Sequence, residues 1–452
     1  MKTTFRHIKA MDFQEVFTTA DAAILEKIGR HLSDPETAIL KGAWQGQSYE
    51  KIAETAGYSP NYLQRDVGRK LWKQLSDALD EEVSKTNFRT ALERRSQQVR
   101  STALKKTAPS TKFESPEGQV PLRSSFYIER PPVETLCYQA MFQPGALIRI
   151  KAPKRMGKTS LLDRILDRAV QQNYRTARLD LGLADTAAID NLDIFLRWFC
   201  AGVGRRLKLP DRIADYWHEV SGSNDNCTAY FEEYLLLEQN NPLVLGLDNI
   251  DRIFSHKAVA QDFFALLRAW HEAGNRGEVW QQLRLVIAYS TEVYIPLDIN
   301  LSPFNVGQTV ELPEFSLEQL QGLAHRYGLS WSESEVQQLM AMVGGHPYLA
   351  RQMFHHCKLH PQLQLVEVLQ TAATEAGIYA HYLRHHFLTL QTDTKLAAAM
   401  KQVVDAVDPV RVGGKQAFQL ESMGLIRRHG NAVIPRCKLY RLYFQESLEG
   451  IG

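Results

Sequence analysis

The sequence predicts an α/β domain with a parallel sheet, preceded by a small all-α domain and followed by further helices. Three observations support this fold class. Between about residues 121 and 330, apolar strand-like runs alternate with helical segments, as they do in parallel sheets. The stretches on either side carry apolar residues at helical spacing. The chain has 452 residues, a length that suggests about three domains.

The composition narrows the class of protein. Hydrophobic residues make up 44% of the chain and charged residues 23%, the proportions of a soluble globular protein. The net charge of +2 does not by itself indicate nucleic-acid binding. The five cysteines form no C-x-x-C pair, so neither a zinc site nor a disulfide framework is indicated. The first residues lack the apolar core of a signal peptide, and no run approaches the roughly 18 apolar residues of a membrane span. We therefore expect a cytoplasmic protein without a membrane partner.

Residues 1–80 predict the all-α domain. A capped helix start at 33–36 is followed by two further helices, the last over 61–79. The segment 49–63, with glycine in its turn, resembles the helix-turn-helix of sigma-factor region four. If it binds DNA, the last helix enters the major groove with four outward polar side chains: Asn61, Gln64, Arg65 and Arg69. The same helices also suit a module for protein contacts, which we keep as the alternative.

Residues 81–120 predict a basic linker. Between residues 85 and 112, eight lysines and arginines face a single acidic residue. Prolines, serines and a glycine then follow, which is typical of an open connection. Such a linker could add phosphate contacts, so that residues 1–112 together bind DNA, or it could be a solvated tether.

The α/β domain is expected to contain five strands with helices between them. The predicted strands are 147–150, 176–181, 243–247, 283–289 and 309–312. The predicted helices are 161–172, 192–206, 228–238 and 261–273. The pattern is helical from 316 to 390, and the last part of the chain resembles a winged helix.

The stretch 146–162 indicates a buried strand, a tight loop and a helix opened by Gly157-Lys158-Thr159. In a phosphate-binding loop of this layout, backbone N–H groups and the helix dipole hold a phosphate. Lys158 would reach the β- and γ-phosphates of ATP, and Thr159 would hold Mg²⁺. Because Ala152 replaces the first glycine of the usual pattern, we expect a slightly altered start of the loop. The expected ATP/ADP-binding residues are Ala152, Pro153, Lys154, Arg155, Met156, Gly157, Lys158, Thr159 and Ser160.

A second apolar strand ends in acid about ninety residues later. Asp248 occupies the position from which P-loop enzymes hold Mg²⁺. The glutamate that usually follows is replaced by Asn249, whose amide cannot accept a proton. General-base help is typically worth about 10²–10⁴-fold in rate. Either Asp251 or Glu292 acts instead, or hydrolysis is slow.

Three further residues are candidate sensors of the γ-phosphate. Ser290 and Thr291 end the next predicted strand, beside the phosphate loop. The motif 344–349 resembles the Gly-x-Pro motif of the helical lid in STAND-class ATPases, whose proline, here Pro347, packs on the adenine. Arg351, one helical turn later, is then a candidate sensor.

The segment 127–134 resembles the stretch that precedes the phosphate loop in the same class. Arg130 and Glu134 match its pattern, which makes Arg130 a candidate nucleotide-binding residue. Arg268 and Arg284 are candidate arginine fingers, with structural salt bridges as the alternative.

Together, these motifs resemble the bacterial AAA-like domain family of STAND-related P-loop ATPases. Its members often carry an N-terminal helix-turn-helix associated with von Willebrand/MoxR systems. The resemblance rests on 154–160, 248–251, 289–296 and 344–349. It implies an ASCE sheet of order 5-1-4-3-2 over residues 121–315, a helical lid over 316–390 and a winged helix over 391–452. It also implies ADP-to-ATP switching, often with oligomerisation.

Three functions are compatible with these residues. The first is a signalling switch whose nucleotide state controls a homo-oligomer or a protein partner, with weak ATPase activity. The second is an ATP-dependent DNA-binding regulator or transposition-type ATPase. The third is a pseudo-ATPase scaffold, suggested by Asn249 and Ala152. We favour the first.

Overall fold

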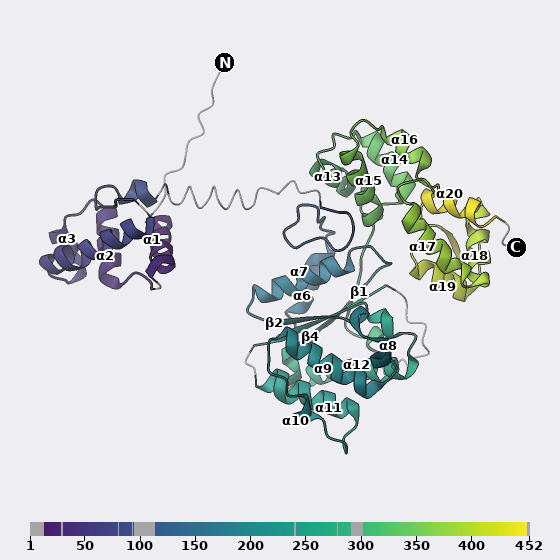
Figure 1. Cartoon of the computed structure of the whole chain (residues 1–452), viewed down its shortest axis with the longest axis horizontal. Helices are drawn as coiled ribbons and strands as arrows, with labels where there is room; N and C mark the ends of the chain where they lie inside the picture. The colour runs from purple at the N-terminus through teal and green to yellow at the C-terminus, as the bar shows by residue number, and fades with distance from the viewer. Residues whose placement is uncertain are drawn as a thin grey trace. The chain divides into compact units, whose positions relative to one another are not determined.

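The computed structural model describes residues 13–28, 30–79, 81–92, 94, 114–238, 241–277, 279–290 and 302–449 (Figure 1). The predicted site residues Thr291 and Glu292 lie outside this part of the chain, as does the linker stretch 95–113. The chain divides into two compact units, Met1–Lys112 and Phe113–Gly452. Each unit has apolar cores of its own.

The first unit packs its helices around one apolar core. Its elements are α1 (Phe13–Ile28), α2 (Asp34–Trp44), α3 (Tyr49–Ala56), the π-helical η1 (Tyr62–Gly68) and α4 (Arg69–Leu79). Ser33 and Glu36 form a capping box at the start of α2, and α3 ends where Gly57 takes left-handed backbone. One side of each helix supplies core side chains such as Ile24, Ile39 and Leu71. The helix expected at 61–79 is therefore present, with π-helical turns at its start.

The second unit contains a five-stranded parallel sheet. Its strands are β1 (Leu147–Lys151), β2 (Arg175–Asp180), β3 (Leu243–Asp248), β4 (Leu283–Tyr289) and β5 (Gln308–Glu311). Every paired strand is parallel, and the order is β2-β3-β4-β1-β5. This is the predicted order 5-1-4-3-2 counted from the other edge, so the predicted fold class is confirmed for the sheet.

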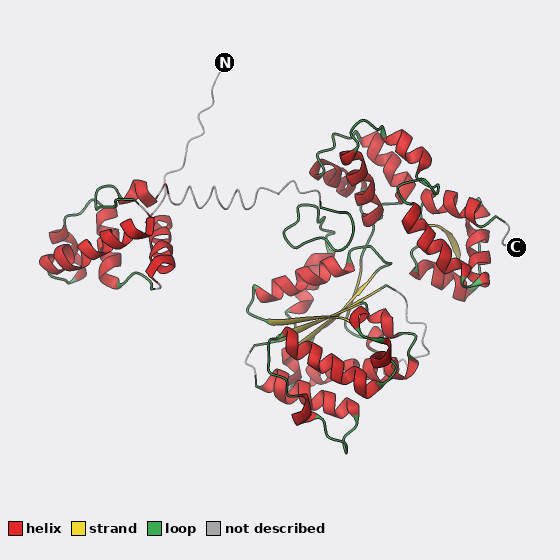
Figure 2. Cartoon of the chain, viewed as in Figure 1, coloured by secondary structure: helices red, strands yellow, loops and turns green. Residues whose placement is uncertain are grey.

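Helices cover both faces of the sheet (Figure 2). One face packs against α6 (Val133–Met141) and α7 (Lys158–Val170); the other packs against α9 (Leu192–Arg206), η3 (Tyr230–Leu237) and α12 (Lys257–Arg276). From Leu285 to Tyr289, successive residues of β4 alternate between the two cores, which is why this part of the strand is a continuous apolar run. Shorter elements are η2 (Leu181–Leu183), α8 (Thr186–Ile189), α10 (Ile213–Tyr216), α11 (Ser223–Ala229), η4 (Ile250–Ile253), η5 (Val279–Gln282) and η6 (Pro303–Asn305).

The rest of the second unit is largely helical. It contains α13 (Leu317–Arg326), α14 (Glu333–Val343), α15 (Pro347–Leu359), α16 (Leu365–Thr371), α17 (Ala380–Gln391), α18 (Thr394–Asp405), α19 (Gly414–Ser422), β6 (Ile426–His429), β7 (Ala432–Pro435) and α20 (Lys438–Ser447). One apolar core runs from Phe315 to Leu448. The boundary between the lid and the winged helix lies within this shared core, and both assignments stay predictions. None of the described helices combines the length and apolarity needed to cross a bilayer.

Candidate functional site: the phosphate-loop cavity

The phosphate loop connects the end of β1 to the start of α7, at the edge where parallel strands end. Its backbone is left-handed at Arg155, with φ of 63°, and at Gly157, with φ of 96°. The loop needs no positive φ at Ala152, so alanine is accommodated there without strain. At position 157 a Cβ would lie 3.1 Å from the Arg130 guanidinium, and glycine suits both the conformation and the space.

Two side chains at the start of α7, those of Lys158 and Thr159, donate hydrogen bonds to other residues of the predicted site. Lys158 Nζ donates to the carbonyl oxygens of Ala152 and Pro153, at 2.9 Å each. Burial lowers the pKa of Lys158 to about 8, while the charges of Asp251 and Asp248 oppose this shift. The Thr159 hydroxyl donates to Asp248 Oδ2 at 2.9 Å. The structure thus brings together the lysine, threonine and aspartate of the predicted site.

Asp248 and Thr159 offer the ligand types that Mg²⁺ prefers. Its side chain is almost fully buried, and its Oδ1 accepts the backbone N–H of Asn249 at 3.0 Å. A carboxylate beside a hydroxyl suits Mg²⁺, which binds proteins through one or two carboxylates together with phosphates and water. Asp248 and Thr159 would hold the metal, and bound Mg²⁺ would neutralise phosphate charge. Among the described residues, no cluster of three or more His, Cys, Asp or Glu side chains forms a separate metal site.

Asn249, at the usual position of the base, and Asp251, a candidate to replace it, both form hydrogen bonds within the chain. Asn249 has left-handed backbone with φ of 53°, and its amide donates to Asp180 Oδ1 at 2.8 Å. Asp251 Oδ1 accepts the backbone N–H of Ser290 at 3.1 Å. Ser290 is buried and lines the cavity beside the loop, and its role as a sensor stays a prediction, whereas Asp251 holds the end of β4.

A cavity of about 470 Å³ opens above the loop, a size within the usual range of ligand sites. Its walls include Lys154, Arg155, Gly157, Lys158, Thr159, Ser160, Asp248, Pro347, Tyr348 and Arg351, together with residues 116–120. The Arg155 guanidinium lies 4.1 Å from the centre of the Tyr348 ring and 3.1 Å from the Glu117 carboxylate. Glu117 also accepts the Tyr348 hydroxyl. The loop, the segment before the core and α15 therefore share one cavity.

Three further predicted site residues, Arg130, Ser160 and Arg351, bind segments next to the cavity. Arg130 is buried and donates to the Met156 carbonyl oxygen at 2.8 Å, and the Met156 side chain lies in the apolar core. The Ser160 hydroxyl accepts the backbone N–H of Val120 at 2.8 Å. Arg351 reaches the cavity, where it donates to the Ser115 carbonyl oxygen at 3.2 Å.

The two candidate arginine fingers contact their own chain. Arg268 pairs with Glu272 at 2.7 Å and donates to the Ser302 carbonyl oxygen at 2.9 Å. Arg284 is the second residue of β4, at the opposite end of the strands from the phosphate loop, and donates to the Gln281 carbonyl oxygen. Structural contacts therefore account for the observed positions of both.

Three charged residues of the cavity, Glu117, Arg178 and Asp180, were not predicted from the sequence. Arg178 on β2 donates to Asp248 Oδ2 at 2.8 Å and lines the same cavity as Lys158. The position of Arg178 near Asp248 can be inferred only from the strand order. Once β2 is placed beside β3, Asp180 aligns with Asp248, and Arg178 aligns with Gly246, two residues before Asp248.

Family models match nearly the whole chain. The model of the AAA-like domain matches residues 115–446. The chain belongs to the AAA-like domain family. The model of the vWA-MoxR associated protein N-terminal HTH matches residues 11–95 of this AAA-like protein, so the predicted resemblance is confirmed in both parts. No curated protein matches the chain.

Several solved structures are similar to this AAA-like protein over much of its length. A Walker-type ATPase of Pyrococcus abyssi overlays with a TM-score of 0.53 at 12% identity, covering 74% of this chain and 99% of its own. An ORC2 protein of Aeropyrum pernix, solved as ADPNP–ADP complexes, gives 0.46 at 15% identity, with 75% and 96% covered. A STAND protein with a tetratricopeptide repeat sensor from Pyrococcus horikoshii gives 0.30 at 15% identity, with 75% and 44% covered. At these identities the likeness to the first structure extends to the fold alone.

The matched helix-turn-helix presents the predicted polar side chains. The four candidate DNA-binding residues, Asn61, Gln64, Arg65 and Arg69, are all exposed, while Leu63 between them is buried in the core. The helix is therefore oriented as predicted, with its polar side outward.

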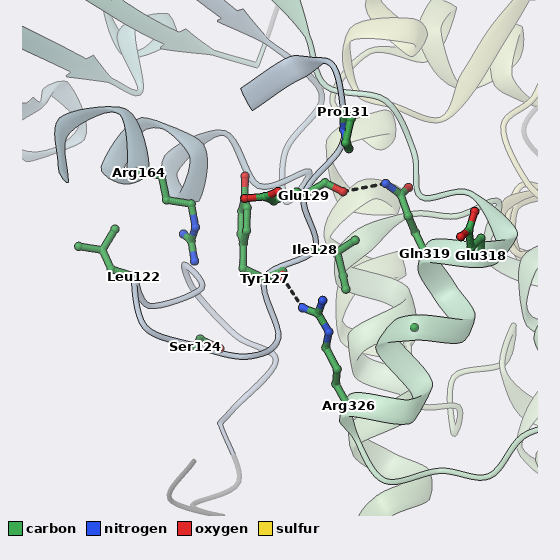
Figure 3. A pocket seen from close by; sticks show the side chains of 11 residues that line it. Leu122, Ser124, Tyr127, Ile128, Glu129, Pro131, Arg164, Glu318, Gln319 and Arg326 are labelled. Atoms are coloured by element: carbon green, nitrogen blue, oxygen red, sulfur yellow. Dashed lines mark hydrogen bonds between the residues drawn. The ribbon is translucent and has the colours of Figure 1, made fainter. Parts of the chain in front are cut away.

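A second hollow, of about 650 Å³, lies between the segment 122–131 and α13 (Figure 3). Its polar side chains bind neighbouring segments: Gln319 donates to the Glu129 carbonyl oxygen, and Arg326 donates to that of Tyr127. The Arg164 guanidinium lies over the Tyr127 ring at 3.5 Å. These contacts fasten the segment before the core to α7 and α13.

Proposed function

We propose that this AAA-like protein is a switch that binds ATP and ADP with Mg²⁺ and changes the packing of residues 316–449 on the phosphate loop. The shared cavity supports this function, because Pro347, Tyr348 and Arg351 line it together with the loop. A nucleotide in the cavity would contact both parts, so a γ-phosphate could favour one packing over another. The output would be a homo-oligomer or the binding of a protein partner.

The charges of the cavity suit a polyphosphate. Lys154, Arg155 and Lys158 all line it, and α7, with 13 residues, begins at the loop. Cations and a helix N-terminus both favour bound phosphate. Asp248 and Thr159 would hold the metal that accompanies the phosphates.

The test compares hydrogen exchange of the full chain without nucleotide, with ADP and with a non-hydrolysable ATP analogue. We expect different protection of α15 and of residues 114–121 in the two nucleotide states. Lys158→Ala should weaken binding by about 10- to 100-fold, because it removes a charge-assisted contact to phosphate. Lys257→Ala, which removes an exposed ammonium on α12, should behave like the wild type.

Identical exchange with ADP and the ATP analogue, at saturation, would contradict the switch. Nucleotide would then be structural, as in the scaffold hypothesis.

A second function, binding of duplex DNA by residues 1–112, is favoured by the family match at residues 11–95 and by the exposed Arg65 and Arg69. If residues 1–112 bind DNA, they would attach the nucleotide-binding unit, residues 113–452, to DNA.

A further inference from the structure

An arginine lies against the carboxylate that is expected to hold the metal. Arg178 Nη2 is 2.8 Å from Asp248 Oδ2, the oxygen that also accepts the Thr159 hydroxyl. The Asp248 side chain is 2% exposed and that of Arg178 is 28% exposed. A guanidinium does not lose its proton in proteins. The buried carboxylate therefore has a permanent cationic partner of its own.

Three segments hold Arg178 in this position. Its Nη1 donates to Asp163 on α7 at 2.8 Å and to Gln119 Oε1 at 3.0 Å, while Nη2 reaches Asp248 on β3. On β3, the residue that aligns with Arg178 is Gly246, where an added Cβ would lie 2.9 Å from the Leu162 side chain of α7. The arginine is thus fixed by two carboxylates and an amide while it still lines the cavity.

We propose that Arg178 competes with Mg²⁺ for Asp248 and makes nucleotide binding by this chain only weakly dependent on the metal. The inference rests on the proposed nucleotide site. A fixed positive charge beside the carboxylate opposes a divalent cation there. The positive charge of the same guanidinium would attract a phosphate bound in the cavity, so part of the charge compensation would persist without metal. Arg178 is therefore a positioning residue that sets the metal dependence of the site.

The experiment measures the Kd of ADP in excess Mg²⁺ and in excess EDTA for the full chain. The ratio of the EDTA value to the Mg²⁺ value should be below about threefold in the wild type and rise by about tenfold in Arg178→Gln. Arg178→Lys keeps the positive charge but loses the planar set of donors that contacts both carboxylates, so its ratio should lie between those of the wild type and Arg178→Gln. Arg168→Gln removes an exposed arginine from the neighbouring α7 and should leave the ratio unchanged.

An equal ratio in the wild type, Arg178→Lys and Arg178→Gln would overturn the proposal, as would a wild-type ratio already above about tenfold. If Arg178→Gln does not fold, the wild-type ratio and Arg178→Lys decide the question. A wild type that binds ADP in neither condition would instead contradict the proposed nucleotide site. Lys158→Ala should lose affinity in both conditions, which separates loss of the site from loss of metal competition.

Discussion

At the scale of single residues, the amide at position 249 has a structural role as well as a catalytic consequence. Asparagine and aspartate adopt left-handed backbone more readily than other residues with side chains, and Asn249 has φ of 53°. Its amide also donates to Asp180. A glutamate at 249 would lose that donor and strain the backbone by about 1–2 kcal/mol. Replacing Asn249 by the usual glutamate is therefore a poor test of turnover.

Exchanging the side chains of Asp180 and Asn249 gives a sharper test of whether the missing base limits ATP hydrolysis. Asp180→Asn combined with Asn249→Asp keeps a donor and an acceptor in place and puts a carboxylate at the base position. We expect phosphate release from ATP to rise by at least about tenfold over the wild type, toward the roughly 10²–10⁴-fold that general-base catalysis supplies. A phosphate-release assay measures this directly.

The single variants are the controls for the exchange. Asn249→Asp alone brings two carboxylates together and should melt at a lower temperature than the double variant, because like charges repel. Asp180→Asn alone adds no base and should leave phosphate release at the wild-type rate. A double variant that folds and binds ATP but releases phosphate no faster would place the base elsewhere, with Asp251 as the remaining described candidate.

At the scale of elements, local patterns predicted the strands but not the contacts between them. Each strand was predicted to within one residue, because apolar runs and their boundaries are local properties. The pair of Arg178 and Asp248 joins residues 70 positions apart, and Tyr348 reaches Glu117 across 231 positions. Strand register and the packing of α15 on the loop decide these contacts, and neither is encoded in a local pattern. The phosphate loop was predictable because its motif is contiguous.

One element contact offers a direct test of how the C-terminal part packs on the loop. Gly424, with φ of 78°, lies so close to the loop that an added Cβ would be 2.7 Å from Pro153 Cβ. Gly430, in the turn between β6 and β7, has φ of 59° and open space around it. Gly424→Ala and Gly430→Ala therefore share the backbone strain but differ in the steric contact. Gly424→Ala should destabilise the chain by about 1–3 kcal/mol more than Gly430→Ala, measured by urea unfolding.

The Gly424 variant should also affect the cavity. Gly424 lies in the connection between α19 and β6, and Pro153 belongs to the phosphate loop. Displacing this connection should therefore change the Kd of ADP, whereas Gly430→Ala should leave the Kd at the wild-type value. Equal stability and equal Kd in the two variants would show that the connection at Gly424 does not pack on the phosphate loop in solution.

At the scale of the whole molecule, the two units offer different chemistry. The second unit contains the phosphate-loop cavity, and the first presents exposed polar side chains on a helix-turn-helix. The net charge of +2 provides no general attraction for nucleic acid, so DNA binding would depend on a local set of cations in residues 1–112. Salt dependence and local substitutions can therefore separate DNA binding from a module for protein contacts.

We expect the full chain to bind duplex DNA with an affinity that falls steeply as salt rises, because phosphate contacts release counterions. Arg65→Gln with Arg69→Gln should weaken binding and reduce the salt slope by about one for each of these arginines that binds a phosphate. Arg212→Gln, an exposed arginine of the second unit, is the control and should bind as the wild type does. Fluorescence anisotropy of a labelled duplex across a salt series measures both quantities. If the double variant matches the control at every salt concentration, this helix does not contact DNA. Its exposed side chains would then be free to contact a protein, and the nucleotide-dependent unit would act through that partner.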